Sequence, residues 1–387
     1  MAKYKLGDIC EIVSGSTPKT SIEEYWDGDI KWITPAEIND DTYIVTDSVR
    51  KITDLGAKKT GLSPFPEGTV ILSSRAPIGK VAIAGCAMCC NQGFKNLICS
   101  EKILNKYLYW FLKGNTSFLN SLGRGATFKE ISKSIVSQIE INVPDIEYQK
   151  EAADILEKVS EVIYLRKQEL TALDNLINAR FVEMFGDPVK NPKGWEVVTI
   201  GDIVTEVRYG TSKPAVEGGK YPYLRMNNLT ADGHLDLNDL KYIDIPDDEI
   251  EKCVVRKGDV LFNRTNSIEL VGKTVVFDLQ EDMIIAGYII RVRLNKRLLP
   301  EILSQYMNLE ALKDILRSMA KGAVNQANIN AQELRSIKVY IPDMELQKQF
   351  IEMKNQVDKS KFDTMTFAPI YDIINLYLHT HFYQGRR

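Results

Sequence analysis

A seven-residue segment occurs twice in this chain, and that duplication constrains the fold more than any other feature. It reads Pro-Asp-Ile-Glu-Tyr-Gln-Lys from Pro144 and Pro-Asp-Met-Glu-Leu-Gln-Lys from Pro342, which lies 198 positions later. Shorter landmarks return at similar displacements: Gly7-Asp8-Ile9 recurs at Gly201, and Ile78-Gly79-Lys80 recurs as Val271-Gly272-Lys273. The small drift in displacement indicates one unit duplicated, with insertions in its loops. We therefore predict two copies of one module.

Each module has short strand-like runs separated by turn residues, followed by a stretch with helical spacing. In the first copy Thr69-Val70-Ile71-Leu72 is one such run, and the helical stretch is 104–112. In the second copy Asp259-Val260-Leu261-Phe262 corresponds to that run, and the helix is expected over 301–316. These patterns predict a mixed α/β (α+β) fold in each module.

Between the modules lies the most regular apolar spacing in the chain. Leu156, Ile163, Leu170, Ile177 and Met184 are seven residues apart, which is the spacing of a coiled-coil seam. A similar stripe follows the second copy of the motif from Leu346, although Pro369 interrupts it. We predict two long antiparallel coiled-coil helices, the second one interrupted near Pro369. A helix lying flat on its own module is the alternative.

These boundaries divide the chain into four parts. They are a first module over 1–144, a central helix over 145–186, a second module over 187–342 and a C-terminal helix over 343–387.

Composition limits the classes of function. Apolar residues make up 44% of the chain and charged residues 26%, as in a soluble globular protein, and no apolar run is long enough to cross a membrane. We therefore expect a cytoplasmic protein. The net charge is −3, but 145–184 holds nine acidic and five basic residues, so the modules themselves are close to neutral. Binding to a polyanion would need a local basic face.

Sequence signals for catalysis and for bound cofactors are weak. The chain has three histidines, and Gly272-Lys273-Thr274 lacks the first glycine of a phosphate loop because Ser267 stands there. Cys86, Cys89, Cys90 and Cys99 could be read as zinc ligands, yet they flank apolar strand-like runs and have no histidine nearby. We expect a non-enzymatic binding protein with no metal and no cofactor.

Several short motifs recur in a fixed order around the heptad helix. They are Leu6-Gly7-Asp8-Ile9, Gly15-Ser16-Thr17-Pro18, Trp32-Ile33-Thr34-Pro35, Gly125-Ala126-Thr127, the two Pro-Asp-x-Glu-x-Gln-Lys segments, and Phe185-Gly186-Asp187-Pro188 followed by Asn191-Pro192-Lys193-Gly194-Trp195. Because these motifs occur in this order, the chain resembles the specificity subunit of type I restriction–modification systems over nearly its whole length.

The resemblance implies two target-recognition domains, each reading half of a bipartite sequence in double-stranded DNA. It implies that the helices hold the two domains apart and dock a pair of methyltransferase subunits, and that a motor-nuclease subunit joins through that complex. It also implies that the chain has no catalytic centre of its own.

Side chains that read bases in the major groove are Arg or Lys for guanine, Asn or Gln for adenine, and Ser or Thr for either. Such residues stand in turn-rich stretches of both modules, and we take them as candidate DNA contacts. In the first module they are Thr17, Lys19, Thr34, Ser74, Arg75, Lys80 and Lys129. In the second they are Arg225, Asn227, Asn228, Arg264, Asn266, Lys273, Asn325 and Gln326.

The two modules are expected to present these residues in the same way. The stretch 72–80 aligns with 262–273, so each module would offer an arginine (Arg75 or Arg264) and then Gly-Lys from one loop. Lys80 and Lys273 suit phosphate better than bases. Two other interpretations remain open: a coiled-coil protein–protein scaffold without DNA specificity, and a specificity subunit of a related restriction system.

Overall fold

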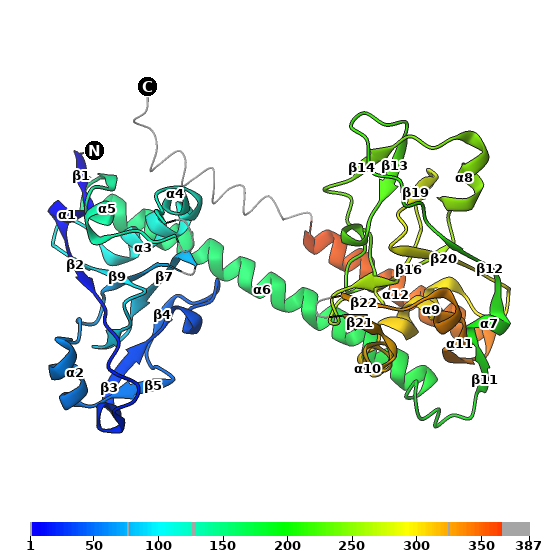
Figure 1. Cartoon of the computed structure of the whole chain (residues 1–387), viewed down its shortest axis with the longest axis horizontal. Coiled ribbons are helices and arrows are strands. Elements are labelled where there is room, and N and C mark those ends of the chain that lie inside the picture. The colour runs from blue at the N-terminus through cyan, green and yellow to red at the C-terminus, as the bar shows by residue number, and fades with distance from the viewer. Residues whose placement is uncertain (1, 76, 126–128, 324–325, 366–387) are drawn as a thin grey trace. The chain divides into compact units, whose positions relative to one another are not determined.

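The structure is a computed structural model that describes residues 2–75, 77–125, 129–323 and 326–365 (Figure 1). The chain divides into two compact units, and the boundary between them falls inside the long helix α6 (Ile146–Phe185). The first unit extends to Gln168, and the second runs from Glu169 to Met365. None of the helices in the described part of the chain is both long and apolar enough to cross a membrane.

The first unit is built around a five-stranded sheet of order β2-β9-β6-β7-β4, with a three-stranded sheet β5-β3-β8 beside it and the pair β1-β10. Its strands are β1 (Ala2–Lys5), β2 (Cys10–Ser14), β3 (Trp26–Ile33), β4 (Ile44–Val45), β5 (Arg50–Ile52), β6 (Val70–Ser74), β7 (Ile78–Ala84), β8 (Cys89–Cys90), β9 (Lys95–Cys99) and β10 (Glu140–Val143). Its helices before α6 are α1 (Leu6–Ile9), α2 (Asp54–Thr60), α3 (Asn105–Gly114), α4 (Thr116–Ser121) and α5 (Lys133–Ser137), with the 3-10 turns η1 (Glu23–Tyr25) and η2 (Pro35–Glu37).

The second unit has sheets of order β12-β20-β16-β18, β14-β13-β19-β15 and β17-β22-β21, and the pair β11-β23. Its strands are β11 (Glu196–Thr199), β12 (Val204–Tyr209), β13 (Tyr221–Leu224), β14 (Lys241–Ile243), β15 (Val254–Val255), β16 (Val260–Asn263), β17 (Thr265–Asn266), β18 (Thr274–Val276), β19 (Met283–Ile285), β20 (Ile289–Leu294), β21 (Lys321–Ala323), β22 (Gln326–Asn328) and β23 (Lys338–Ile341). Its helices are α7 (Ile200–Ile203), α8 (Asp247–Cys253), α9 (Pro300–Asn308), α10 (Glu310–Met319), α11 (Ala331–Ser336) and α12 (Met344–Met365), with the 3-10 turn η3 (Met226–Asn228).

The predicted mixed α/β fold in two copies is confirmed by matching strand pairs. Val70 of β6 pairs with Ile83 of β7, and Val260 of β16 pairs with Val276 of β18. In the other sheet the parallel pair β3-β8 of the first unit corresponds to β13-β19 of the second. The two units therefore share their strand connections as well as their motifs.

The glutamine of the duplicated motif explains why that motif recurs. Gln149 is fully buried; its Nε2 donates to the carbonyls of Lys102 and Pro144, and its Oε1 accepts from the N–H of Leu104 at 2.8 Å. Gln347 makes the corresponding bonds to the carbonyls of Arg297 and Pro342 and to the N–H of Leu299. One side chain thus satisfies one buried and two part-buried backbone groups at the start of each long helix.

Helix α6 is one helix of 40 residues, and the ends of its heptad stripe are buried in the two units. Leu156 is buried in the core of the first unit with Ala152. Ile177 is buried in the core of the second unit with Phe181 and Phe185. Gly186, in the left-handed conformation (φ 88°), follows the last turn of the helix, as its stop signal predicts.

The predicted antiparallel pairing of the two long helices is also observed. The rings of Phe181 on α6 and Phe350 on α12 lie 5.2 Å apart, and Asp174 pairs with Lys361. The contact nearer the N-terminus of α6 (Asp174) is thus made with the residue nearer the C-terminus of α12 (Lys361), so the two helices run antiparallel. The stretch around Pro369, where we expect an interruption, lies outside the described residues.

The prediction of one helix over 301–316 is wrong. The chain forms α9 and α10 with a break at Leu309, whose backbone is extended (φ −64°, ψ 141°). Leu309 is buried in the core of the second unit, so the break lets both helices direct their apolar residues into that core.

Candidate nucleic-acid interface

In the first unit, loops far apart in sequence meet next to the turn η2. The side chains of Thr17 and Gln92 are hydrogen-bonded, and the indole Nε1 of Trp32 donates to the carbonyl of Ser16 at 2.9 Å. The N–H of Ser74 donates to the carbonyl of Gly93 at 2.7 Å, and a Cβ on Gly93 would lie 3.0 Å from Pro35. The stretches around residues 16, 34, 74 and 92 therefore form one cluster.

Arg75 and Lys129 extend this cluster. Arg75 forms a β-bridge with Glu130, and its guanidinium lies 3.6 Å from the Glu130 carboxylate. Lys95 reaches the same carboxylate at 3.2 Å. Lys129, next in sequence, is exposed, as is Lys19.

The second unit forms a corresponding cluster around Arg264. The Nη1 of Arg264 donates to the carbonyl of Gly287 at 3.4 Å, and its guanidinium lies 5.0 Å from the ring centroid of Tyr209. Asn266 pairs with Ala327 between β17 and β22, which places the exposed Gln326 beside it. The guanidinium therefore lies next to a short polar ribbon.

Arg75 and Arg264 do not occupy equivalent positions. The N–H of Arg264 donates to Tyr288 and its carbonyl accepts from Ile329, whereas in the first unit Ser74 makes the matching bonds with Gly93 and Ile131. The expected alignment of the two arginines is therefore displaced by one residue. Because side chains alternate along a strand, this displacement turns Arg75 to the opposite face.

Lys80 and Lys273 are positioned alike, but both bond to the protein. The Nζ of Lys80 donates to the carbonyl of Pro35 at 2.9 Å, and the Nζ of Lys273 donates to the carbonyls of Met226 and Leu229. Lys273 is 8% exposed, and burial lowers its pKa. Both lysines hold the 3-10 turn against the sheet through these bonds, but Lys80 is half-buried whereas Lys273 is buried.

The other predicted residues differ in accessibility. Asn227 is exposed; Thr34 is half-buried and bonded to Glu37; Arg225 is half-buried and 2.7 Å from Asp239. Ser74 is buried at the end of β6 and Asn228 is buried at the end of η3, and Asn325 lies outside the described residues.

Sequence reasoning missed two features of these clusters. The first is Tyr209, whose ring lies beside Arg264. The second is the need for glycine in the adjoining turn: a Cβ on Gly15 would lie 2.0 Å from the carbonyl of Asn91, and one on Gly210 would lie 2.2 Å from that of Ile285. The sequence signal for this need was the repeat of a glycine followed by two hydroxyl residues, Gly-Ser-Thr from Gly15 and Gly-Thr-Ser from Gly210.

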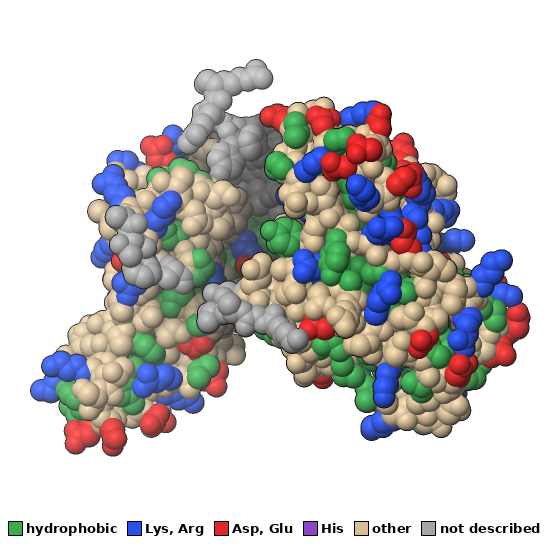
Figure 2. Space-filling model, turned by 45° about the vertical axis from the view of Figure 1, so that its right-hand side comes forward, with side chains coloured by type: hydrophobic (Ala, Val, Ile, Leu, Met, Phe, Trp, Pro, Cys, Tyr) green, Lys and Arg blue, Asp and Glu red, His purple; other side chains and the backbone are tan. Residues whose placement is uncertain are grey.

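On the face shown in Figure 2, Lys and Arg side chains alternate with Asp and Glu and do not gather into one basic patch. The cysteines are free, and burial raises the pKa of the Cys89 and Cys90 thiols to about 11 and about 12. Across the described ranges, no three or more His, Cys, Asp or Glu side chains are grouped so that they could hold a metal ion.

Comparison with known proteins places the chain in a family. The family profile for the "Type I restriction modification DNA specificity domain" matches twice, over residues 1–175 and 192–368. The chain therefore belongs to the family of type I restriction–modification DNA specificity (S) subunits.

Individual relatives agree with this assignment. The type I restriction enzyme MjaIX specificity subunit of Methanocaldococcus jannaschii is 37% identical over 247 residues, which cover 58% of this chain and 57% of that protein. The EcoKI specificity subunit of Escherichia coli is 25% identical over 315 residues, covering 76% of this chain and 68% of that protein. The matched part thus spans between about half and two thirds of these relatives.

Two solved structures share the fold. A chain from a structural study of complex assembly and conformational transition in the type I R-M system superposes with a TM-score of 0.57 at 20% identity, over 98% of this chain and 97% of that one. The S subunit of a type I system from M. genitalium superposes with a TM-score of 0.53 at 15% identity, over 98% and 96%.

Proposed function

We propose that this chain recognises a two-part DNA sequence, with each unit reading one part. The observation that carries the proposal is the double match to a DNA specificity domain, together with an equivalent cluster of polar loops in each unit. Residues 1–144 and 187–342 would be the two target-recognition domains. A DNA role also places the protein inside the cell.

Accessible side chains of the two clusters are the proposed DNA contacts. Exposed lysines and amides are free to reach the duplex, and each of the half-buried arginines directly follows a strand that holds its backbone in place. In the first unit the set is Thr17, Lys19, Thr34, Arg75, Lys80 and Lys129. In the second it is Arg225, Asn227, Arg264, Asn266 and Gln326, and Asn325, outside the described residues, stays a candidate from the sequence alone. Lys273, Ser74 and Asn228 are left out because they are buried.

The long helices would set the distance between the two parts of the target. Helix α6 has 40 residues, so it is about 60 Å long at 1.5 Å per residue. Two recognition domains that contact the same face of a duplex must be separated by one or more helical turns of DNA, each about 34–36 Å long. The same helices would dock a pair of methyltransferase subunits, through which a motor-nuclease subunit joins.

Replacing Arg264 by Ala tests the DNA contact directly. We expect the variant to lose roughly 1–3 kcal/mol of binding free energy for the cognate duplex and to relax selectivity in one part of the target only. Arg335→Ala, an exposed arginine on α11, is the matched control and should bind as the wild type does. The measurement is a titration of the assembled complex with labelled duplexes at several salt concentrations. Unchanged affinity for R264A would remove this loop from the interface, and salt-independent binding would favour a protein scaffold.

Inserting seven residues into α6 tests the spacing role. One heptad adds about 10 Å of helix, close to three base pairs. We expect an insertion after Gln168 to lengthen the spacer of the recognised target and to leave its two specific parts unchanged. Recognition of the original spacing by the lengthened protein would contradict the role of the helix.

A further inference from the structure

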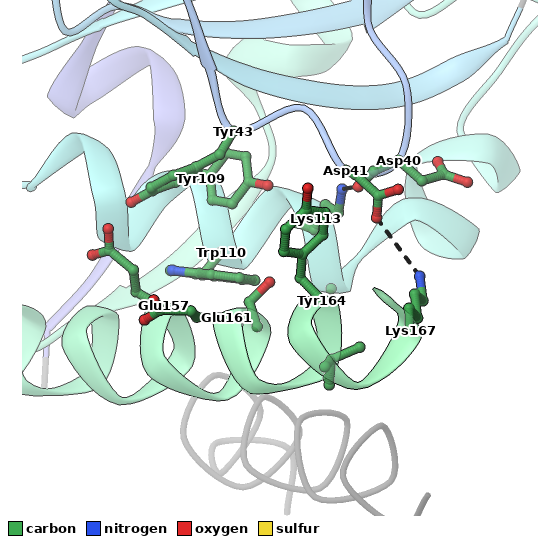
Figure 3. A pocket seen from close by; sticks show the side chains of 13 residues that line it. Asp40, Asp41, Tyr43, Tyr109, Trp110, Lys113, Glu157, Glu161, Tyr164 and Lys167 are labelled. Atoms are coloured by element: carbon green, nitrogen blue, oxygen red, sulfur yellow. Dashed lines mark hydrogen bonds and ion pairs between the residues drawn. The ribbon is translucent and has the colours of Figure 1, made fainter. Parts of the chain in front are cut away.

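A cavity of about 550 Å³ lies in the first unit between the loop that holds Asp40 and Asp41, helix α3 and residues 157–167 of α6 (Figure 3). Its walls include the rings of Tyr43, Tyr109 and Trp110, whose centroids are 4.8–6.2 Å apart. The volume is that of a site for a small ligand or for one large side chain. Nothing in the DNA-recognition role uses this cavity.

Two buried polar atoms of the cavity have no hydrogen-bond partner among the described residues. Trp110 is 5% exposed, yet its indole Nε1 is unpaired, and the hydroxyl of Tyr43 is also unpaired. Figure 3 shows the Trp110 nitrogen on the side of the cavity where Glu157 lies. A buried N–H without an acceptor is costly, so Trp110 calls for a ligand that supplies one.

The cavity also has more acidic than basic groups. Four carboxylates line it, but only two lysines, Lys113 and Lys167. Lys167 pairs with Asp41 at 3.6 Å, and Lys106, from outside the lining, pairs with Glu157 at 2.7 Å. Within the described part of the chain, the carboxylate of Glu161 has no cation beside it. The cavity therefore favours a positive charge.

The second unit closes the equivalent place with its own cations. His234 stands where the first unit has Tyr43, 191 positions earlier and in the same loop after a 3-10 turn. Its ring nitrogens lie 3.2 Å from Asp232 and 3.8 Å from Asp358 on α12. Lys354 and Lys361 also pair with Asp358.

The corresponding positions of the first unit carry no such charges. Ser160 precedes Asp358 by the 198-residue displacement of the helix motif, and Ile163 precedes Lys361 by the same displacement. The first unit therefore keeps Asp41 in the place of Asp232, but it has Tyr43, Ser160 and Ile163 where the second unit has His234, Asp358 and Lys361.

We propose that this cavity binds a guanidinium or ammonium group presented by a partner polypeptide, as an arginine or lysine side chain. The cation would lie against the aromatic rings and beside Glu161 and Glu157, where cation–π and ionic attraction act together. A main-chain carbonyl of the same segment would accept from the Trp110 indole. The inference does not depend on DNA recognition.

The test uses the full chain and a pair of small probes. Nα-acetyl-arginine methylamide carries the cation and the carbonyls, and Nα-acetyl-citrulline methylamide has the same shape without the charge. Binding is followed by the indole ¹⁵N–¹H signals of the four tryptophans, with Trp110→Phe assigning the one in the cavity. We expect the arginine probe to shift the Trp110 signal and to bind at least about tenfold more tightly than the citrulline probe, as loss of a charge-assisted contact implies.

Glu161→Gln should weaken binding of the arginine probe by about tenfold, because it removes the unpaired carboxylate. Glu151→Gln, the same change on an exposed part of α6 outside the cavity, should leave binding unchanged. Equal binding of the two probes, or no effect of E161Q, would overturn the proposal. Guanidinium chloride binding as tightly as the arginine probe would assign the site to a small free cation and overturn the polypeptide source.

Discussion

Position for position, the buried strand β20 of the second unit carries Arg291 and Arg293 where β9 of the first has Asn96 and Ile98. Arg291 is 1% exposed and lies 2.6 Å from Glu206, while Arg293 lies 2.7 Å from Asp259. In the first unit, Asn96 replaces the buried arginine and is also fully buried.

The comparison separates side chains that both units need in order to fold from side chains that can differ between the units. Gln149 and Gln347 are the same residue because both must satisfy backbone groups that any chain with this turn would leave buried. The two arginines of β20 pair with Glu206 and Asp259 from neighbouring segments, so a neutral set of residues can take the place of this network. Backbone-satisfying side chains are thus common to both units, and self-contained charge networks are particular to one.

The largest effect should come from removing the shared glutamine. Gln149→Leu and Gln347→Leu each leave one buried and two part-buried backbone groups unpaired, at up to about 1–3 kcal/mol for each group. We expect each variant to lose roughly 4 kcal/mol or more of unfolding free energy, measured by urea denaturation. Gln168→Leu, on the exposed surface of α6, is the control and should change stability by less than about 0.5 kcal/mol. A large loss of unfolding free energy for one of the two glutamine variants and none for the other would contradict the claim of a common scaffold.

A smaller and one-sided effect is expected for the glutamates on the matching strands. Glu206→Ala leaves the buried Arg291 without its carboxylate and should cost about 3 kcal/mol of unfolding free energy. The equivalent Glu11→Ala removes an exposed side chain, and we expect less than about 0.5 kcal/mol. Denaturation of the two single variants side by side measures the contrast, and equal losses would show that the network is not specific to the second unit.

The smallest effect concerns pH. The neighbouring carboxylates of Asp232 and Asp358, 3.2 and 3.8 Å from the ring nitrogens, raise the pKa of His234 to about 9. Its stabilising contribution is therefore complete below the unfolded pKa near 6.5 and is lost as pH rises through 9. Because the side chain is 41% exposed, we expect a loss of only about 1 kcal/mol between these pH values.

Replacing His234 by Gln should flatten this pH dependence. Tyr43→Phe, at the matching position of the first unit, should leave it unchanged, since burial raises the pKa of Tyr43 well above its ordinary value. Unfolding free energies measured from pH 6 to 9 compare the three proteins. A pH profile of H234Q that still falls like that of the wild type would place the titration elsewhere.

Much of the fold could be predicted from the sequence because it depends on repeated local patterns. The duplicated motif, the strand-like runs and the heptad stripe are all repeating patterns along the chain. Such patterns can be recognised in the sequence without knowing which residues are in contact. The stripe did not reveal that Leu156 and Ile177 are buried in two different cores, because a helix pattern does not say what covers it.

The candidate site was less predictable, because it depends on register and on hydrogen-bond partners. Arg75 and Arg264 look equivalent in an alignment of loops, yet Ser74 makes the bonds that Arg264 makes. Lys273 looks like a phosphate ligand, and only its buried bonds to Met226 and Leu229 reveal its structural role. One-residue register and the direction of a long side chain are fixed by tertiary contacts that no short motif encodes.

The most direct test of recognition by two sibling units is methylation mapping by genome sequencing. A host would carry this chain, either wild type or R264A, with its methyltransferase partner. The wild type should yield a methylated motif of two specific parts around a nonspecific spacer, and R264A should blur one part only. A single uninterrupted motif, or loss of selectivity in both parts at once, would contradict it.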